Sequence, residues 1–317
     1  MKKYVLILAC GLLASVVAHA EKIYNMDLGE AVQAGDIFVD SKTSEPITGV
    51  AQSYYPDGKL KAEIPYKDGR QEGMKRWYYS DGKLQTETPY KNGEEEGIER
   101  QYDPNGQLSI EISYKNGKRE GIGRMYDLDG RLEAEFPYKD GKLEGIVRKY
   151  SSDGKLETET PYKDGKEEGI RKRYYDGQLR KETPYKNGKE EGIEKWYYPD
   201  GKLEREVPHK DGEREGIGRT YDPNGKLEAE TPYKDGKEEG IERWYYPDGM
   251  LNLEIPYKNG EKEGIEKGYY PDGQLMKETL YKNGKEEGIE RWYYPDGKLK
   301  SETPFKNGEK IGETKNY

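Results

Sequence analysis

The stretch EEGIERWYYPDGKL, residues 286–299, indicates a sequence repeat, because the chain contains it twice with one change. Residues 238–251 read the same except that Met250 stands in place of Lys298. An enzyme site is normally written once, whereas a structural unit can be copied, so a repeat has to be sought before anything else. The glycine of the acidic triplet recurs every 24 residues, with a single step of 23 between Gly169 and Gly192. Eleven full units therefore follow one another from residue 49 to residue 311.

Each unit is numbered here from this glycine as position 0. An apolar residue occupies position 1, Tyr position 5, Gly position 9 and Leu position 11 in all eleven units, and Tyr occupies position 17 except at His209 and Phe305. Because these apolar positions are mostly odd, the alternation predicts strands with positions 1, 5, 11, 13, 15 and 17 on one face. The structural residues predicted on this basis include Tyr54, Tyr150, Tyr245, Leu60, Leu156, Leu251, Gly73, Gly145 and Gly240.

Two turns divide each unit into a hairpin. The first, YPDGK, suits a type I turn followed by a left-handed glycine, and the second, KNGK or KDGK, also centres on a glycine. In the 23-residue unit the first turn shrinks to Asp176–Gly177, which suits a two-residue loop. Both loop lengths keep Tyr at position 5 opposite Leu at position 11, so Tyr174 is expected to face Leu179.

A single hairpin is marginal in water, so consecutive hairpins must support one another. The predicted fold is therefore all-β: an elongated single-sheet array of about eleven 24-residue hairpins in a meander, coiled by its twist. The expected domains are a signal peptide (1–20), an N-terminal cap with an extra strand at DIFVD (21–48), the hairpin repeats (49–311) and a C-terminal capping strand (312–317).

The first twenty residues have the pattern of an export signal. Lys2 and Lys3 precede an apolar run to Ala18, and AHA before Glu21 is a small-x-small cleavage site, so cleavage is expected after Ala20. An alternative interpretation takes ILAC as a lipoprotein box with a lipid on Cys10, but the apolar run continues beyond that cysteine. Export places the protein in the periplasm, at the outer envelope or outside the cell.

Composition narrows the classes of function. Charged residues make up 37% of the chain and hydrophobic residues 32%, yet there are 30 tyrosines, which suits a thin structure rather than a thick core. Cleavage after Ala20 would change the formal charge from −9 to −11, since the signal carries two lysines and no acidic residue. An acidic chain is a poor partner for nucleic acid. It would also lack cysteine, because Cys10 is the only one.

The period, with YYPDGKL, PYKNGK and the position-0 glycine, resembles the MORN-repeat family, most closely its bacterial variant repeat. The resemblance covers about residues 49–317 and implies the hairpin-array fold. It also implies two kinds of role, because relatives are often catalogued as antitoxins and others are membrane-associated scaffolds. The lipid-kinase activity of some plant relatives is not implied, since the chain has neither a Walker-type loop nor a kinase catalytic loop.

No residue pattern predicts catalysis, a cofactor or a metal. His209 stands where the other units have Tyr or Phe, so it is interpreted as a core substitution rather than as a catalytic base. Glu at position 14 occurs in all eleven units, which indicates a structural role, opposite the next unit's glycine, rather than a glycosidase pair. The Gly-Gly-x-Gly-x-Asp pattern of calcium-binding repeats is absent.

Four units carry Trp at position 4 followed by Tyr at position 6, on the face expected to lie opposite Tyr at position 5. One interpretation is that these aromatic pairs stiffen the strands. The other is a binding stripe for an extended partner, because aromatic residues dominate interface energetics. The partner-binding candidates are Trp196, Tyr198, Trp244, Tyr246, Trp292 and Tyr294.

These observations predict an exported, non-enzymatic repeat protein that offers an elongated surface to a protein partner. One alternative is an antitoxin or immunity-like inhibitor of a toxin, which requires one tight complex. Another is a module that binds wall glycan or a lipid headgroup, although an acidic chain suits anionic lipids poorly. Pairing of two copies through the apolar sheet face is a further expectation.

Overall fold

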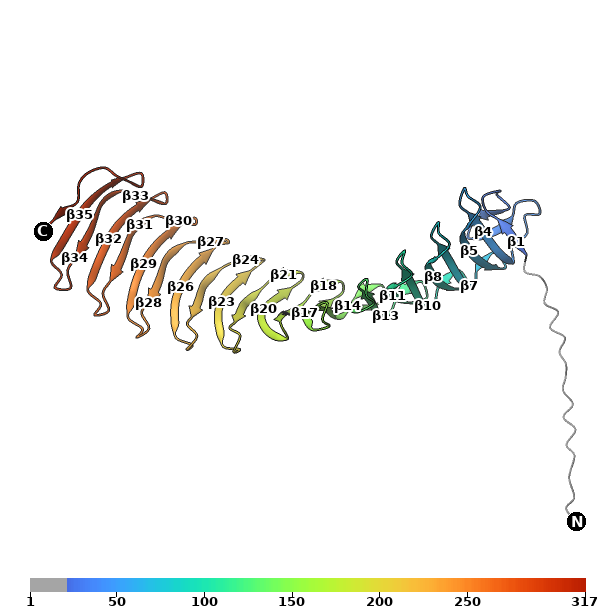
Figure 1. Ribbon diagram of the computed structural model, residues 1–317, viewed down its shortest axis with the longest axis horizontal. Helices are drawn as coiled ribbons and strands as arrows, with labels where there is room; N and C mark the ends of the chain where they lie inside the picture. Colours follow the sequence, from blue (N-terminus) through green and yellow to red (C-terminus); the bar gives the residue numbers. More distant parts are fainter. Residues whose placement is uncertain (1–21) are drawn as a thin grey trace, which may run out of the picture. The chain divides into compact units, whose positions relative to one another are not determined.

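The computed structural model describes residues 22–317, which form strands and turns and contain no helix (Figure 1). The predicted signal peptide and Cys10 lie outside the described residues. The chain divides into two compact units, up to Gly106 and from Gln107 onward, and each is described by itself. Within each unit the repeats are antiparallel hairpins joined in chain order, which confirms the predicted all-β meander of 24-residue repeats.

Unit 1 contains the cap and the first hairpins. Its strands are β1 (Ile23–Asn25), β2 (Ala31–Ala34), β3 (Ile37–Asp40), β4 (Gly49–Tyr54), β5 (Leu60–Lys67), β6 (Arg70–Gln71), β7 (Gly73–Tyr78), β8 (Leu84–Lys91), β9 (Glu94–Glu95) and β10 (Gly97–Tyr102). The strand expected at DIFVD is β3, which pairs with β2 in a separate two-stranded sheet. The repeats are instead extended by β1, which lies parallel to β4.

A compact apolar cluster lies between the cap and the first hairpin of unit 1. Ile47 and Ala51 are fully buried there, and Tyr24 is only 5% exposed. The amide of Phe38 donates to the carbonyl of Gly69 at 2.8 Å, which ties the cap to the second turn of the first hairpin. The cap therefore covers β4, which would otherwise be an exposed edge strand, and one turn of the first hairpin.

Unit 2 repeats one pattern of long and short strands. The first strands of its hairpins are β13 (Gly121–Tyr126), β16 (Gly145–Tyr150), β19 (Gly169–Tyr175), β22 (Gly192–Tyr197), β25 (Gly216–Tyr221), β28 (Gly240–Tyr245), β31 (Gly264–Tyr269) and β34 (Gly288–Tyr293). The second strands are β11 (Leu108–Lys115), β14 (Leu132–Lys139), β17 (Leu156–Lys163), β20 (Gln178–Lys186), β23 (Leu203–Lys210), β26 (Leu227–Lys234), β29 (Leu251–Lys258), β32 (Leu275–Lys282) and β35 (Leu299–Lys306).

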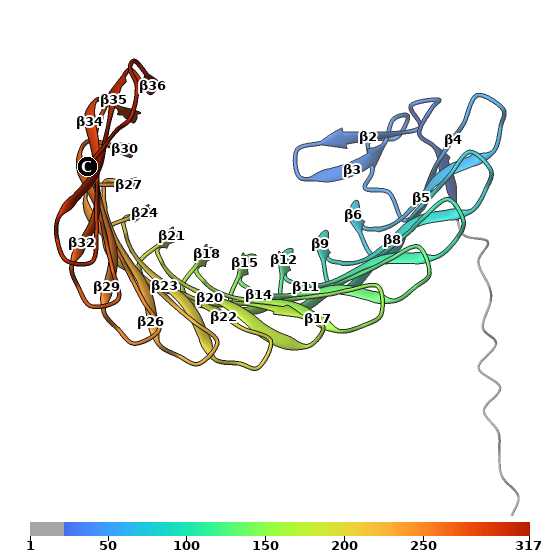
Figure 2. The ribbon, with the colours of Figure 1, turned by 60° about the vertical axis from the view of Figure 1, so that its left-hand side comes forward.

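Short strands follow the second turns, and in Figure 2 several of them lie along one edge of the long strands. They are β12 (Lys118–Arg119), β15 (Lys142–Leu143), β18 (Lys166–Glu167), β21 (Lys189–Glu190), β24 (Glu213–Arg214), β27 (Lys237–Glu238), β30 (Glu261–Lys262), β33 (Lys285–Glu286) and β36 (Glu309–Lys310). The last strand, β37 (Lys315–Asn316), pairs with β35.

The turns have the predicted chemistry. In the first turn the amide of Tyr55 donates to the carbonyl of Lys59 at 2.8 Å, and Gly58 has a positive φ of 83°. In the second turn both central residues, such as Asp164 and Gly165, have positive φ, as a primed turn requires. The short unit keeps its register, with Tyr174 opposite Leu179.

The predicted division of faces is wrong for half of each repeat. Tyr150 lies opposite Leu156, but Lys149 lies opposite Thr158, so Glu157 at position 12 is an unpaired bulge residue. One extra residue reverses the parity of everything after it. Residues directly opposite each other share a face. Positions 2, 4, 13, 15 and 17 therefore form what is called here the core face, and positions 1, 3, 5, 11, 14 and 16 form the tyrosine face.

Burial agrees with this register. On the core face Ala134 and Val207 are fully buried and Val147 is 5% exposed, whereas Tyr at position 5 on the tyrosine face is half-buried. Small and β-branched residues are common at positions 13 and 15 of the core face, and Tyr occupies position 17 in most repeats. Trp at position 4 therefore lies beside the residues at position 13, as Trp244 does opposite Leu253.

Candidate functional site

The tyrosine face carries a row of exposed isoleucines at position 1. In unit 2 they are between 41% and 49% exposed, and they are Ile122, Ile146, Ile170, Ile193, Ile217, Ile241, Ile265 and Ile289. Each lies opposite the residue at position 16 of its own hairpin, which is Pro in most repeats, as in the pair Ile146 and Pro161. The row of Ile at position 1 and the residue at position 16 is called here the isoleucine ridge. It continues through unit 2 with one isoleucine about every 10 Å, the width of two strands.

The position-0 glycine makes the ridge continuous. Gly169 has a positive φ of 113°, and a Cβ added there would lie 3.0 Å from Cγ of Pro161 in the preceding repeat. The proline ring therefore fills the space that a side chain would occupy. Gly145 and Gly240 have the same relation to Pro137 and Pro232, so the structural role predicted for these glycines has a specific cause.

A polar ladder runs beside the ridge on the same face. Glu at position 14 accepts a hydrogen bond from Tyr at position 5 of the next repeat, as in the 2.8 Å bond from Tyr78 to Glu63. It also pairs with the basic residue at position 3, as Arg148 does with Glu159 at 3.2 Å. The expectation that this Glu lies opposite the next glycine is wrong: Glu63 lies opposite Arg76. The register changes beside the second turn, because Tyr66 lies opposite Gln71 but Glu63 lies opposite Arg76, so two extra residues are accommodated around Gly73. Pro at position 16 therefore lies beside the glycine.

Because of the tyrosine hydrogen bonds in the ladder, the stability of the folded chain should decrease at alkaline pH. Burial, followed by the hydrogen bond and charge of Glu63, raises the pKa of Tyr78 to about 12. The same order of causes raises the pKa of Tyr269, beside Glu254, to about 12. The folded chain therefore favours the neutral phenol, so this stabilisation is complete below about pH 10 and is lost between about pH 10 and 12. Phenolate absorbance and the β-sheet dichroism signal should change together in that window. Ionisation of these tyrosines near pH 10 without loss of sheet would contradict the ladder.

The predicted aromatic pairs do not form one free stripe. The hydroxyls of Tyr198 and Tyr246 donate to the backbone carbonyls of Tyr221 and Tyr269 in the next repeat, each at 2.7 Å. The Trp196 ring lies against the ammonium of Lys181, with 4.5 Å between nitrogen and ring centre. These three residues thus make contacts that hold the array together.

Two of the other three candidates, Trp244 and Tyr294, are exposed. The indole N–H of Trp292 donates to Glu290 at 2.8 Å. Trp244 is 36% exposed and Tyr294 is 42% exposed. Partner binding by the six aromatic residues stays a prediction.

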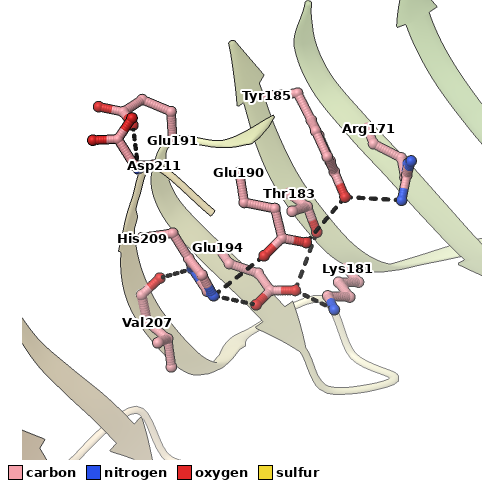
Figure 3. A network of polar contacts seen from close by, with 10 residues as sticks. All are labelled: Arg171, Lys181, Thr183, Tyr185, Glu190, Glu191, Glu194, Val207, His209 and Asp211. Atoms are coloured by element: carbon pink, nitrogen blue, oxygen red, sulfur yellow. Dashed lines mark hydrogen bonds and ion pairs between the residues drawn. The ribbon is translucent and has the colours of Figure 1, made fainter. Parts of the chain in front are cut away.

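The core face contains a polar cluster of which the sequence shows only one sign, a histidine in place of the repeated tyrosine. His209 is buried, with its ring Nε2 3.3 Å from Oε2 of Glu190 and 3.7 Å from Oε2 of Glu194 (Figure 3). Its Nδ1 lies 3.1 Å from the carbonyl oxygen of Val207. His209 is thus on the core face, as a core substitution would be, but it faces two carboxylates. Glutamates at these two positions are common among the repeats, so only the histidine distinguishes this repeat in the sequence.

Hairpins of one design, repeated in both units and tied together within each unit by the polar ladder, make this a β-hairpin repeat protein. The chain belongs to the MORN repeat variant family, whose model matches eleven consecutive segments. The matched residues are 47–68, 71–92, 95–116, 119–140, 143–164, 167–187, 190–211, 214–235, 238–259, 262–283 and 286–307.

Comparisons with curated proteins and with solved structures give weaker similarity than the family model. No curated protein matches the chain. A chain in the crystal structure of TcdB2-TccC3-Cdc42 is 13% identical over 86% of this chain and 19% of that chain, with a TM-score of 0.18. A chain in the crystal structure of TcdB2-TccC3 is also 13% identical, over 80% and 20% of the two chains, with a TM-score of 0.14. The protein spans about a fifth of either chain.

Proposed function

We propose that the protein is an exported, non-enzymatic repeat protein that binds a protein partner along the isoleucine ridge. The family supports an interaction role in general terms. The observation that carries the proposal is the ridge itself: eight isoleucines of unit 2 remain more than 40% exposed in a regular row. Contiguous exposed apolar surface on a soluble protein commonly marks a contact site.

The surroundings of the ridge suit a protein interface. Exposed lysines at position 18, among them Lys163, Lys186 and Lys210, border it on one side. Arg and Glu of the polar ladder border it on the other. An apolar centre with a charged rim is the usual anatomy of a protein–protein contact. In residues 22–317 there is no helix long and apolar enough to span a bilayer.

Export rests on the first twenty residues. The proposed mature chain begins at Glu21 and carries no lipid, which N-terminal sequencing of the exported protein tests directly. Finding an acylated Cys10 would contradict it.

Binding is tested by substituting three neighbouring ridge residues together, Ile193→Ser, Ile217→Ser and Ile241→Ser. The tagged parent chain is used to capture a partner from envelope extract, and the affinity of that partner is then measured. Because the three side chains are nearly half exposed, the variant should stay folded but bind at least about tenfold more weakly.

The aromatic stripe supplies the control for this experiment. Trp244→Ala removes an exposed aromatic side chain from the other face, and Gln101→Ala changes the same repeat position in a repeat without Trp. Both should bind the partner as the parent does. If Trp244→Ala alone weakens binding, the contact lies on the core face and the ridge proposal is wrong. A single tight one-to-one complex with a toxin would favour the antitoxin role.

A further inference from the structure

We propose that Glu190, Glu194 and His209 form a binding site for a divalent transition-metal ion of the zinc type. The three residues come from three consecutive strands of unit 2: β21, β22 and β23. Their ligand atoms all lie within 4.8 Å of one another. The site is independent of the ridge, which lies on the opposite face.

The histidine is arranged as a metal ligand. Its side chain is more than nine-tenths buried, at 6% exposure. Nδ1 lies within hydrogen-bond distance of the Val207 carbonyl, and because a carbonyl only accepts, Nδ1 carries a proton. In the neutral ring this leaves Nε2 as a lone-pair donor. A metal-bound histidine characteristically donates its other N–H to a carbonyl in this way.

The two carboxylates each keep one oxygen for the ion. On Glu190, Oε1 accepts the hydroxyl of Tyr185 at 3.0 Å. On Glu194, Oε1 accepts the hydroxyl of Thr183 at 3.1 Å and contacts the ammonium of Lys181. The other oxygen of each carboxylate is turned toward Nε2 of His209 (Figure 3). Protein donors therefore orient the ligands without using the atoms that would bind.

With a neutral ring, three acceptors face one another, and they require a cation or a proton between them. Two carboxylate oxygens and an imidazole lone pair repel at these distances. The separations of 3.3 and 3.7 Å from Nε2 agree with the edges of roughly 3.3–3.6 Å expected between ligands bound at about 2.0–2.2 Å in tetrahedral geometry. A nitrogen ligand with two carboxylates favours zinc-type ions over calcium or magnesium, which prefer oxygen alone.

Neighbouring cations do not fill the site. Lys181 contacts the far oxygen of Glu194. Arg214 lies opposite His209 in register, and its guanidinium lies over the Tyr233 ring, 5.3 Å from the ring centre. A hollow reaches the cluster from the surface and leaves room for a water ligand in the fourth position. Besides the three ligands it is lined by Lys181, Trp196, Glu213 and Arg214.

The repeats provide their own comparison. Glu238, Glu242 and Tyr257 occupy the same three repeat positions two units later. There a phenol hydroxyl donates to Glu242, and burial together with both glutamates raises the pKa of Tyr257 to about 12, so a proton lies between the acceptors. His209 replaces that donor with a lone pair in this repeat. His209→Tyr should thus restore the common arrangement and remove the metal site while keeping the fold.

Zinc titration of the mature chain by calorimetry, with Co²⁺ absorption as a second probe, tests the proposal. The parent should bind one Zn²⁺ and show the visible bands of tetrahedral Co²⁺. His209→Tyr should weaken binding more than about 100-fold with an unchanged urea midpoint, and Glu190→Gln should weaken it at least about tenfold. Equal affinity in parent and His209→Tyr would assign the metal to scattered surface carboxylates and overturn the site. Absence of binding by the parent, with both His209 ring nitrogens protonated by NMR, would show that a proton holds the cluster and would overturn it too.

Discussion

Gly49→Ala is expected to release strand β1 from unit 1 and to cost about 3 kcal/mol or more of that unit's stability. Gly49 has a positive φ of 143°, and an added Cβ would lie 2.1 Å from the carbonyl oxygen of Lys22. That oxygen is backbone and accepts the amide of Val50 at 2.9 Å, so it can move only if β1 leaves β4. Tyr24 would then lose its buried position. Hydrogen exchange at residues 23–26, with urea unfolding, measures the effect.

Gly73→Ala is the matched control, since Gly73 has the same repeat position one hairpin later. Its φ is 111°, but an added Cβ would meet only the Pro65 ring, at 3.2 Å, and a ring can shift slightly. Backbone strain alone should cost about 1–2 kcal/mol there. If the two variants lose equal stability and residues 23–26 stay protected in both, the explanation for Gly49 fails.

Tyr150→Ala should cost about 2–3 kcal/mol, the second large effect. The ring is half-buried opposite Leu156, and its hydroxyl donates to Glu135 at 3.2 Å. The loss is smaller than a fully buried ring would give because Tyr150 lies on the tyrosine face and not on the core face. Urea unfolding of the parent and variant provides the measurement.

Two variants separate the contributions of Tyr150. Tyr150→Phe keeps the ring and loses one hydrogen bond, so it should cost about 1 kcal/mol. Ser151→Ala removes a turn hydroxyl that contacts Asp153 and the Lys155 carbonyl, and it should cost less than about 0.5 kcal/mol. Equal losses in Tyr150→Ala and Ser151→Ala would contradict the packing described for position 5.

Much of the fold could be predicted because its determinants are local and repeated. The glycines at positions 9 and 20 mark the turns. The one-residue deletion at Asp176–Gly177 indicates which residues lie opposite each other, because the shortened turn must keep Tyr at position 5 facing Leu. The predicted division of faces is wrong because a bulge needs no particular residue type. Position 12, where the bulge lies, is occupied by residues as ordinary as Lys61, Glu133 and Glu157. No residue type in the repeat marks the point at which the alternation of faces changes. The residues opposite Trp give no consistent sign of it, since Trp77 lies opposite Ala62 and Thr86 but Trp196 lies opposite Lys181 and Arg205.

The two candidate sites differ in how visible they are in the sequence. The apolar residue at position 1 is evident in the sequence, but its exposure is not. The exposure arises because the bulge places positions 13, 15 and 17 on the opposite face and because proline and glycine pack together between repeats. The cluster at His209 was partly visible, because a histidine replaces a repeated tyrosine. Its chemistry depends on the ring orientation set by Val207 and on glutamates from two other strands, which only the register brings together.

Partner binding along the isoleucine ridge is tested most directly by the accessibility of a single thiol. Cys10 is the only cysteine in the sequence, so Ile217→Cys gives the mature chain one reactive site on the ridge. Met250→Cys places an equally exposed thiol in a first turn, since these two side chains are 45% and 44% exposed. The maleimide reaction rate is measured with and without the captured partner. The ridge account predicts that the partner slows the reaction at residue 217 at least about tenfold and leaves residue 250 unchanged. An unchanged rate at residue 217 in the presence of saturating partner would contradict it.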